Sequence, residues 1–251
     1  NKKKIFLIGK GGSINQINLE KSGMYDEDSL IINLNDSETI IIGSIAIVAN
    51  KLTKKRIANK EIKPSASIYI SDEKIINCNS IVVTNDKKDI EESGLLISQM
   101  QSDKLFFFDK AILTAIHLSI IFAQEFNIKY EIFLLGVDLE NYGNMANDSI
   151  DNSADESFEY SNKILNSQFE HLKLIIQNQE KFNVNIKHVG LSSISWIDPN
   201  GFNSLFFSFH NKIKKSNYSK IKSNQNDILH SDHKVKIVAE ITTNHFGDED
   251  R

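Results

Sequence analysis

Two continuous apolar runs, separated by an apolar segment of helical length, constrain the fold of this chain more than any other feature. The runs are Leu105–Phe108 and Tyr130–Val137, and the segment between them, Ala111–Phe126, is apolar on nearly every side. Strands that are apolar throughout, rather than at alternate positions, are typical of parallel sheets covered on both faces. The stretch therefore predicts a strand, a helix capped by Asp109 and a second, parallel strand.

Further short runs rich in branched apolar residues predict the rest of the sheet. They are Ile5–Ile8, Ser29–Asn35, Ile40–Asn50, Ala66–Ser71, Ser80–Asn85 and Val184–Ser193. A capping box, Ser153 with Glu156, precedes a long amphipathic helix. We expect a doubly wound α/β domain over residues 1–213, with a mainly parallel, Rossmann-like sheet and helices on both faces.

Net charge and cysteine content limit the partners and cofactors that we expect for this chain. A net charge of −4 and a pI near 6.0 argue against nucleic acid or an anionic membrane as the main partner. Cys78 is the single cysteine, which excludes an intrachain disulfide, a cysteine-based zinc site and a CxxC redox pair. We expect Cys78 to be a buried, inert thiol, and we expect a cytoplasmic protein without a signal peptide or a membrane span.

The first strand runs into a glycine-rich turn made of Gly9, Lys10, Gly11, Gly12 and Ser13. Glycines permit positive φ and close approach of a ligand, and a helix that begins near Ser13 and ends near residue 22 would direct free N–H groups at a phosphate. A turn that merely requires glycines is the alternative. The spacing matches neither dinucleotide nor P-loop motifs, which argues against a Walker-type ATPase.

Polar residues at other strand ends are candidate neighbours of this turn, because the carboxyl ends of parallel strands form the ligand crevice. They are Asn35 and Asp138, followed by Tyr142 in a polar loop that covers residues 140–155. Thr114, a polar exception on the apolar helix, is a further candidate for nucleotide binding.

A histidine on the apolar helix and a basic cluster each have both a structural and a functional interpretation. His117 lies on the apolar helix, where a satisfied core histidine is commoner than a reactive one. The basic cluster Lys51–Arg56 either neutralises a phosphate or forms the solvated face of a short helix, and we favour the helix face.

Composition changes again near the end of the chain. Residues 214–234 are rich in Lys, Ser and Asn and are expected to form a linker, and Val235–Ile241 then predicts a new strand. The segment Ile237–Asp248 resembles the start of the barrel of sialic acid (N-acetylneuraminate) synthases, with Thr242 in place of a glycine. The resemblance implies that Glu240 faces an amino-sugar substrate. We therefore expect residues 235–251 to be the truncated start of a (β/α)8 barrel whose missing part holds the divalent metal and could form a homo-oligomer.

Residues 1–213 resemble bacterial sialyltransferases that use CMP-sialic acid and, more loosely, pyrophosphokinase-like proteins. Gly9–Ser13 stands where the transferases carry G-N-G-P-S, Asn33–Asn35 where they carry R-x-N, and Tyr130–Tyr142 is similar to their strand and tyrosine-bearing loop. The resemblance implies CMP or a CMP-sugar as ligand, with Tyr142 at the donor phosphate. It also implies a base close to Lys163 or His171.

Three functions follow as expectations. The first is a CMP-sugar-binding, sialyltransferase-like domain fused to a sialic acid synthase, acting by displacement at the anomeric carbon of the sugar. The second is a non-catalytic module that binds a nucleotide or a partner and regulates the synthase. The third is ATP-dependent pyrophosphoryl transfer, with Mg²⁺ held by carboxylates such as Asp138.

Overall fold

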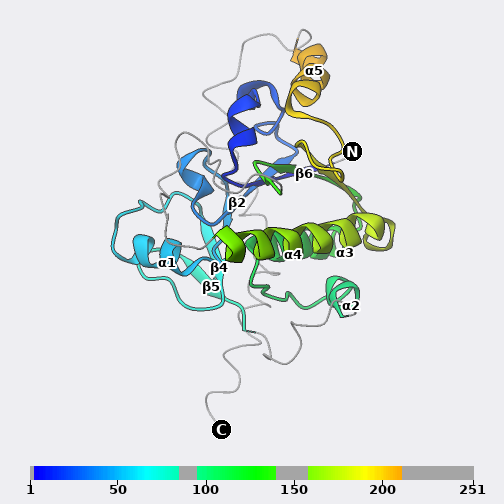
Figure 1. Ribbon diagram of the computed structural model, residues 1–251. Helices are drawn as coiled ribbons and strands as arrows, with labels where there is room; N and C mark the ends of the chain where they lie inside the picture. The colour runs from blue at the N-terminus through cyan, green and yellow to red at the C-terminus, as the bar shows by residue number, and fades with distance from the viewer. Residues whose placement is uncertain (1–2, 85–94, 140–157, 211–251) are drawn as a thin grey trace.

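The computed structural model describes residues 3–84, 95–139 and 158–210. Its centre is a seven-stranded sheet in the order β5-β4-β3-β2-β1-β6-β7, in which all neighbouring strands run parallel (Figure 1). The chain forms the sheet outward from β1 in one direction and then crosses to add β6 and β7 on the other side. The expected Rossmann-like α/β fold is confirmed.

The strands are β1 (Lys3–Ile8), β2 (Ser29–Leu34), β3 (Ile45–Ile47), β4 (Ile68–Ser71), β5 (Ser80–Val82), β6 (Tyr130–Leu135) and β7 (Val184–His188). The α-helices are α1 (Lys51–Ala58), α2 (Leu96–Met100), α3 (Ala111–Glu125), α4 (Phe158–Gln177) and α5 (Pro199–His210). Four short 3-10 helices complete the described elements: η1 (Gly12–Gln16), η2 (Leu19–Lys21), η3 (Ser37–Thr39) and η4 (Gln179–Phe182).

Side chains of the central strands alternate between two cores. Ile5 and Leu7 of β1 pack in the larger core with α3 and with Leu172 and Ile175 of α4. The other face is covered in two parts. Phe6 and Ile8 pack with η1 and α5, whereas β3 and β4 pack with α1. Helices therefore lie on both faces, which explains why β1 and β6 are apolar at every central position.

The apolar run Leu105–Phe108 is not a strand, contrary to the prediction from its composition. Its side chains enter the larger core, but two of its N–H groups bond to side chains of α3. The Phe106 N–H donates to His117 Nδ1 at 3.1 Å, and the Phe108 N–H donates to Thr114 Oγ1 at 2.8 Å. Thr114 and His117 of α3 thus supply acceptors that a neighbouring strand would otherwise provide.

His117 is completely buried, and its second ring nitrogen bonds to the Ser102 carbonyl at 3.2 Å. The carbonyl can only accept and the Phe106 N–H can only donate, so the ring is neutral with its proton on Nε2. Burial lowers the pKa of His117 to about 4, against the opposing effect of these backbone hydrogen bonds. The interpretation of His117 as a satisfied core histidine agrees with this geometry.

A pH-dependent stability follows from the buried His117. Below pH 6.5 the unfolded chain protonates this histidine while the folded chain does not, so stability falls as the pH decreases from about 6.5 to about 4. The full loss is about 3 kcal/mol. Urea unfolding at pH 7 and pH 4.5 measures it, and the His117→Gln variant should show a smaller difference between the two pH values. An unchanged difference in the variant would contradict the assignment.

Candidate functional site

The carboxyl ends of β1, β2 and β6 lie at the point where the sheet changes direction. From β1 the chain proceeds to β2 on one side, whereas the later β6 pairs with the other side of β1. Ile8 is level with Asn33 of β2 and with Leu135 of β6, so the three strands end together. Ligands of doubly wound sheets bind at such a switch point.

The glycine turn packs directly on the backbone that follows β6. The Gly9 N–H donates to Leu135 O and the Gly11 N–H to Gly136 O, each at 2.8 Å. A Cβ atom on Gly9 would lie 2.9 Å from the Gly136 carbonyl carbon and closer still to its oxygen. The glycines therefore permit two backbone segments to touch. Positive φ, which we expected in this turn, occurs across it at Gly136 (+64°) and not at Gly9, Gly11 or Gly12.

Ser13 lies in η1, and the expected helix from Ser13 to residue 22 is wrong: two 3-10 helices occupy this stretch. The break has a tertiary cause. Asn18 donates its N–H to Asn203 Oδ1 on α5 at 2.7 Å, and its own side chain caps η2. At the start of η1, the Ser13 N–H donates to Asp138 Oδ2 at 3.0 Å. Asp138 thus occupies a donor that we had expected to face a phosphate.

Two polar groups beside the turn are buried without hydrogen bonds. The Ser13 hydroxyl oxygen has no partner among the described residues. Asp36, two residues after β2, has a side chain only 1% exposed, and Lys10 Nζ lies 2.8 Å from its Oδ1. Neither carboxylate oxygen accepts a hydrogen bond of ordinary geometry from the described residues. The turn therefore brings one cation, one carboxylate and one hydroxyl to the ends of β1 and β2.

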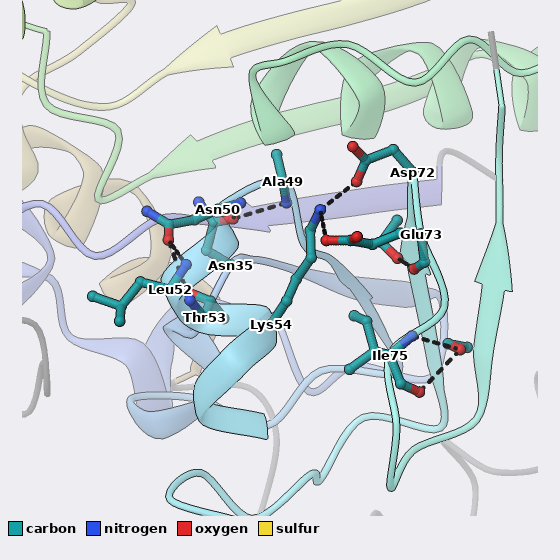
Figure 2. Close-up of polar contacts among 11 residues, drawn as sticks. Asn35, Ala49, Asn50, Leu52, Thr53, Lys54, Asp72, Glu73 and Ile75 are labelled. Carbon is teal, nitrogen blue, oxygen red and sulfur yellow. Dashed lines mark hydrogen bonds and ion pairs between the residues drawn. The ribbon is translucent and has the colours of Figure 1, made fainter. Parts of the chain in front are cut away.

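Asn35 has a structural role at the end of β2. It adopts a left-handed conformation with φ of 54°, and its Oδ1 accepts the N–H groups of Ala49 and Asn50, each at 3.0 Å (Figure 2). Asn50 in turn caps α1 by accepting from the Leu52 and Thr53 N–H groups. The side-chain oxygen of Asn35 therefore joins the ends of β2 and β3.

The basic cluster on α1 contains one lysine with a different environment from the rest. α1 confirms the helix predicted for Lys51–Arg56, but Lys54 is buried rather than solvated. Its Nζ contacts Asp72 Oδ1 and lies 3.0 Å from Glu73 Oε1, at the carboxyl end of β4 (Figure 2). Both of its partners are exposed carboxylates. Lys54 is therefore engaged in holding α1 to β4.

Glu38 is a buried carboxylate with several donors on one of its two oxygens, Oε2, and none from the described residues on Oε1. Its Oε2 accepts from the Ser65 N–H and hydroxyl, from the Ala66 N–H and from Tyr69 OH, the last at 2.5 Å. Burial and the Glu38 charge raise the pKa of Tyr69. Cys78 is partly buried rather than buried as we expected; burial and the same charge raise its pKa to about 11, so the thiol is protonated at neutral pH, which agrees with an inert cysteine.

His188, which we did not select from the sequence, supports the turn from the β7 side. It is 1% exposed, and its Nε2 lies 2.7 Å from the Val137 carbonyl oxygen. Since that oxygen only accepts, Nε2 carries the proton, and Nδ1 accepts from the Ser195 hydroxyl at 2.9 Å. The ring therefore fixes the residue that precedes Asp138. The serines after β7 were the only sequence signal for this contact.

The remaining predicted residues lie elsewhere. Thr114 is completely buried under the sheet, and its hydroxyl accepts from Phe108, so the structure does not bring it to the turn. His171 is half-buried on α4, where burial and the nearby charge of Lys110 lower its pKa, opposed by Asp109. Lys163 also belongs to α4, but its side chain lies outside the described part.

Several expectations concern parts of the chain outside the described residues. These are Tyr142, Glu240, the capping box Ser153 with Glu156, and the proposed linker and barrel start at 214–251. Within residues 3–84, 95–139 and 158–210, no group of three or more His, Cys, Asp or Glu side chains is placed to hold a metal ion. In the same ranges, no helix is both long and apolar enough to cross a membrane.

No protein-family model, curated protein or solved structure is significantly similar to this chain.

Proposed function

We propose that this domain binds a nucleotide, CMP or a CMP-sugar, at the carboxyl ends of β1, β2 and β6. The observation that carries the proposal is a pair of buried polar groups at the switch point, the Ser13 hydroxyl and the Asp36 carboxylate, that have no hydrogen-bond partner among the described residues. Buried polar atoms without partners are costly, and a ligand that supplies the missing hydrogen bonds removes that cost. The Lys10 ammonium, on the same turn, supplies the positive charge that a phosphate requires.

The resemblance to sialyltransferases favours cytidine among nucleotides and suggests the chemistry. The anomeric carbon of the bound sugar would be attacked by an acceptor hydroxyl while CMP leaves with the glycosidic electron pair, and a base would take the hydroxyl proton. We propose that this domain serves a sialic acid synthase barrel begun by residues 235–251. The main alternative is a module that binds a ligand without turnover. The ion pair between Lys10 and Asp36 favours this alternative, because it engages both charged groups beside the turn with each other.

Isothermal titration of the full chain with CMP, CTP and ATP tests the proposal. We expect CMP to bind, and Ser13→Ala to weaken it about fivefold to tenfold through the loss of one hydrogen bond. Ser98→Ala, at an exposed serine of α2, is the matched control and should leave the affinity unchanged. Absence of binding of all three nucleotides refutes the proposal. If CMP binds, hydrolysis or transfer from CMP-sialic acid then distinguishes an enzyme from a binding module.

A further inference from the structure

Asp36 differs from the other buried carboxylate near this edge of the sheet. Glu38, two residues later, receives four hydrogen bonds on Oε2, whereas its Oε1 has no hydrogen-bond partner among the described residues. Asp36 is more deeply buried, and the one polar contact described for its carboxylate is the 2.8 Å approach of Lys10 Nζ. A carboxylate removed from water without donors is unfavourable unless other groups supply them. Asp36 therefore has acceptor capacity that the described part of the fold does not use.

The backbone around Asp36 is held rigidly against β1. Ser37 donates its hydroxyl to the Ile8 carbonyl at 2.6 Å and accepts the Leu34 N–H at 3.0 Å. Asn33 Nδ2 also donates to the Ser37 hydroxyl, at 3.1 Å. These bonds tie the residue after Asp36 to the last residue of β1, directly before the glycine turn. The Asp36 carboxylate is therefore presented at a fixed place beside Gly9–Ser13.

The chemistry of a carboxylate defines which part of a nucleotide it can contact. An ionised carboxylate only accepts hydrogen bonds and repels phosphate, so its partner must be a neutral group with O–H or N–H donors. The ribose hydroxyls of a nucleotide are such donors, and acidic residues after the second strand contact ribose in dinucleotide-binding sheets. The phosphate of the same nucleotide would be repelled by Asp36 and attracted by the ammonium of Lys10.

We propose that Asp36 accepts hydrogen bonds from the ribose hydroxyls of the nucleotide, the 2′-hydroxyl included, when Lys10 turns from Asp36 to the phosphate. This inference rests on the proposed nucleotide site and specifies how that site distinguishes one sugar from another. The ion pair in the free protein exchanges for two ligand contacts, one at each member. The site therefore prefers ribonucleotides to 2′-deoxyribonucleotides.

Calorimetric titration of the full chain with CMP and with 2′-deoxy-CMP tests this selectivity. We expect CMP to bind at least about tenfold more tightly, as for a hydrogen bond to a charged group. In Asp36→Ala the ratio should fall below about threefold, whereas Asp72→Ala, at an exposed carboxylate after β4, should retain it. Asp36→Asn, which preserves the side-chain shape, should also reduce the ratio and replaces Asp36→Ala if that variant does not unfold cooperatively.

Each of the other outcomes refutes one part of the proposal. Equal affinity of the wild-type chain for both nucleotides refutes the ribose contact and leaves the nucleotide site intact. A ratio that persists in the Asp36 variants assigns the selectivity to another residue. Failure of both ligands to bind refutes the proposed function, and the ribose contact with it.

Discussion

Gly9→Ala should cost about 4 kcal/mol or more in the free energy of unfolding. The added methyl group would lie 2.9 Å from the Gly136 carbonyl carbon, closer to the carbonyl oxygen, and 3.3 Å from Val137 Cγ2. The clash is with backbone atoms, which cannot be relieved by a change of rotamer as a clash with a side chain can. Here both segments are also held, because the Gly9 N–H bonds to Leu135 in the β1–β6 ladder.

Chemical denaturation of the full chain measures this cost. Gly11→Ala is the matched comparison, because its methyl group would meet the Asp138 carboxylate, a side chain that can rotate. It should cost less, about 1 to 3 kcal/mol, although it disturbs the Asp138 bond to the Ser13 N–H. A Gly9→Ala variant with a wild-type unfolding midpoint would show that β1 and β6 do not end in contact.

Lys10→Met should lower the free energy of unfolding by about 3 to 5 kcal/mol, the range for removing one member of a buried ion pair. The side chains of Lys10 and Asp36 are 15% and 1% exposed, so the variant leaves the carboxylate without its cation at a place largely removed from water. The methionine keeps the length of the lysine stem and removes the charge. The loss therefore measures the charge on the carboxylate rather than packing.

A double-mutant cycle separates this charge from other effects. Adding Asp36→Asn to Lys10→Met removes the uncompensated carboxylate, so the double variant should recover part of the stability lost in Lys10→Met. Lys104→Met, at an exposed lysine, is the control and should be neutral within about 0.5 kcal/mol. Strictly additive losses in the cycle would mean that Lys10 and Asp36 do not interact in solution.

The sheet could be predicted because burial on both faces leaves a continuous apolar pattern in a single sequence. Ile5–Ile8 and Tyr130–Val137 show this pattern, and β1 and β6 are buried as expected. Leu105–Phe108 carries the same pattern without being a strand, because a buried run needs partners for its N–H groups but does not determine which groups provide them. Thr114 and His117 provide them here. The spacing of apolar residues in the sequence does not indicate hydrogen bonds of this kind between a backbone N–H and a side chain.

The candidate site was predictable only in outline. The glycines and Asp138 were identifiable because both stand where a strand ends, and strand ends of a parallel sheet converge. The role of the glycines was predicted incompletely, since Gly9 and Gly11 accommodate another part of the chain, the segment from Gly136 to Asp138. Asp36 and His188 were missed because their importance depends on burial and on distant partners, Lys10 and Val137, which a local pattern does not specify.

The contact between the glycine turn and Asp138 also bears on how the protein folds. Ser13 and Asp138 are 125 positions apart, so the site does not form until the long connection through β2 to β5 and α3 has closed. Closing such a loop is slow compared with forming local structure. A nascent chain that has not yet extended past β6 therefore contains the glycine turn without its opposing wall. The contact between Ser13 and Asp138 therefore forms only once β6 docks on β1.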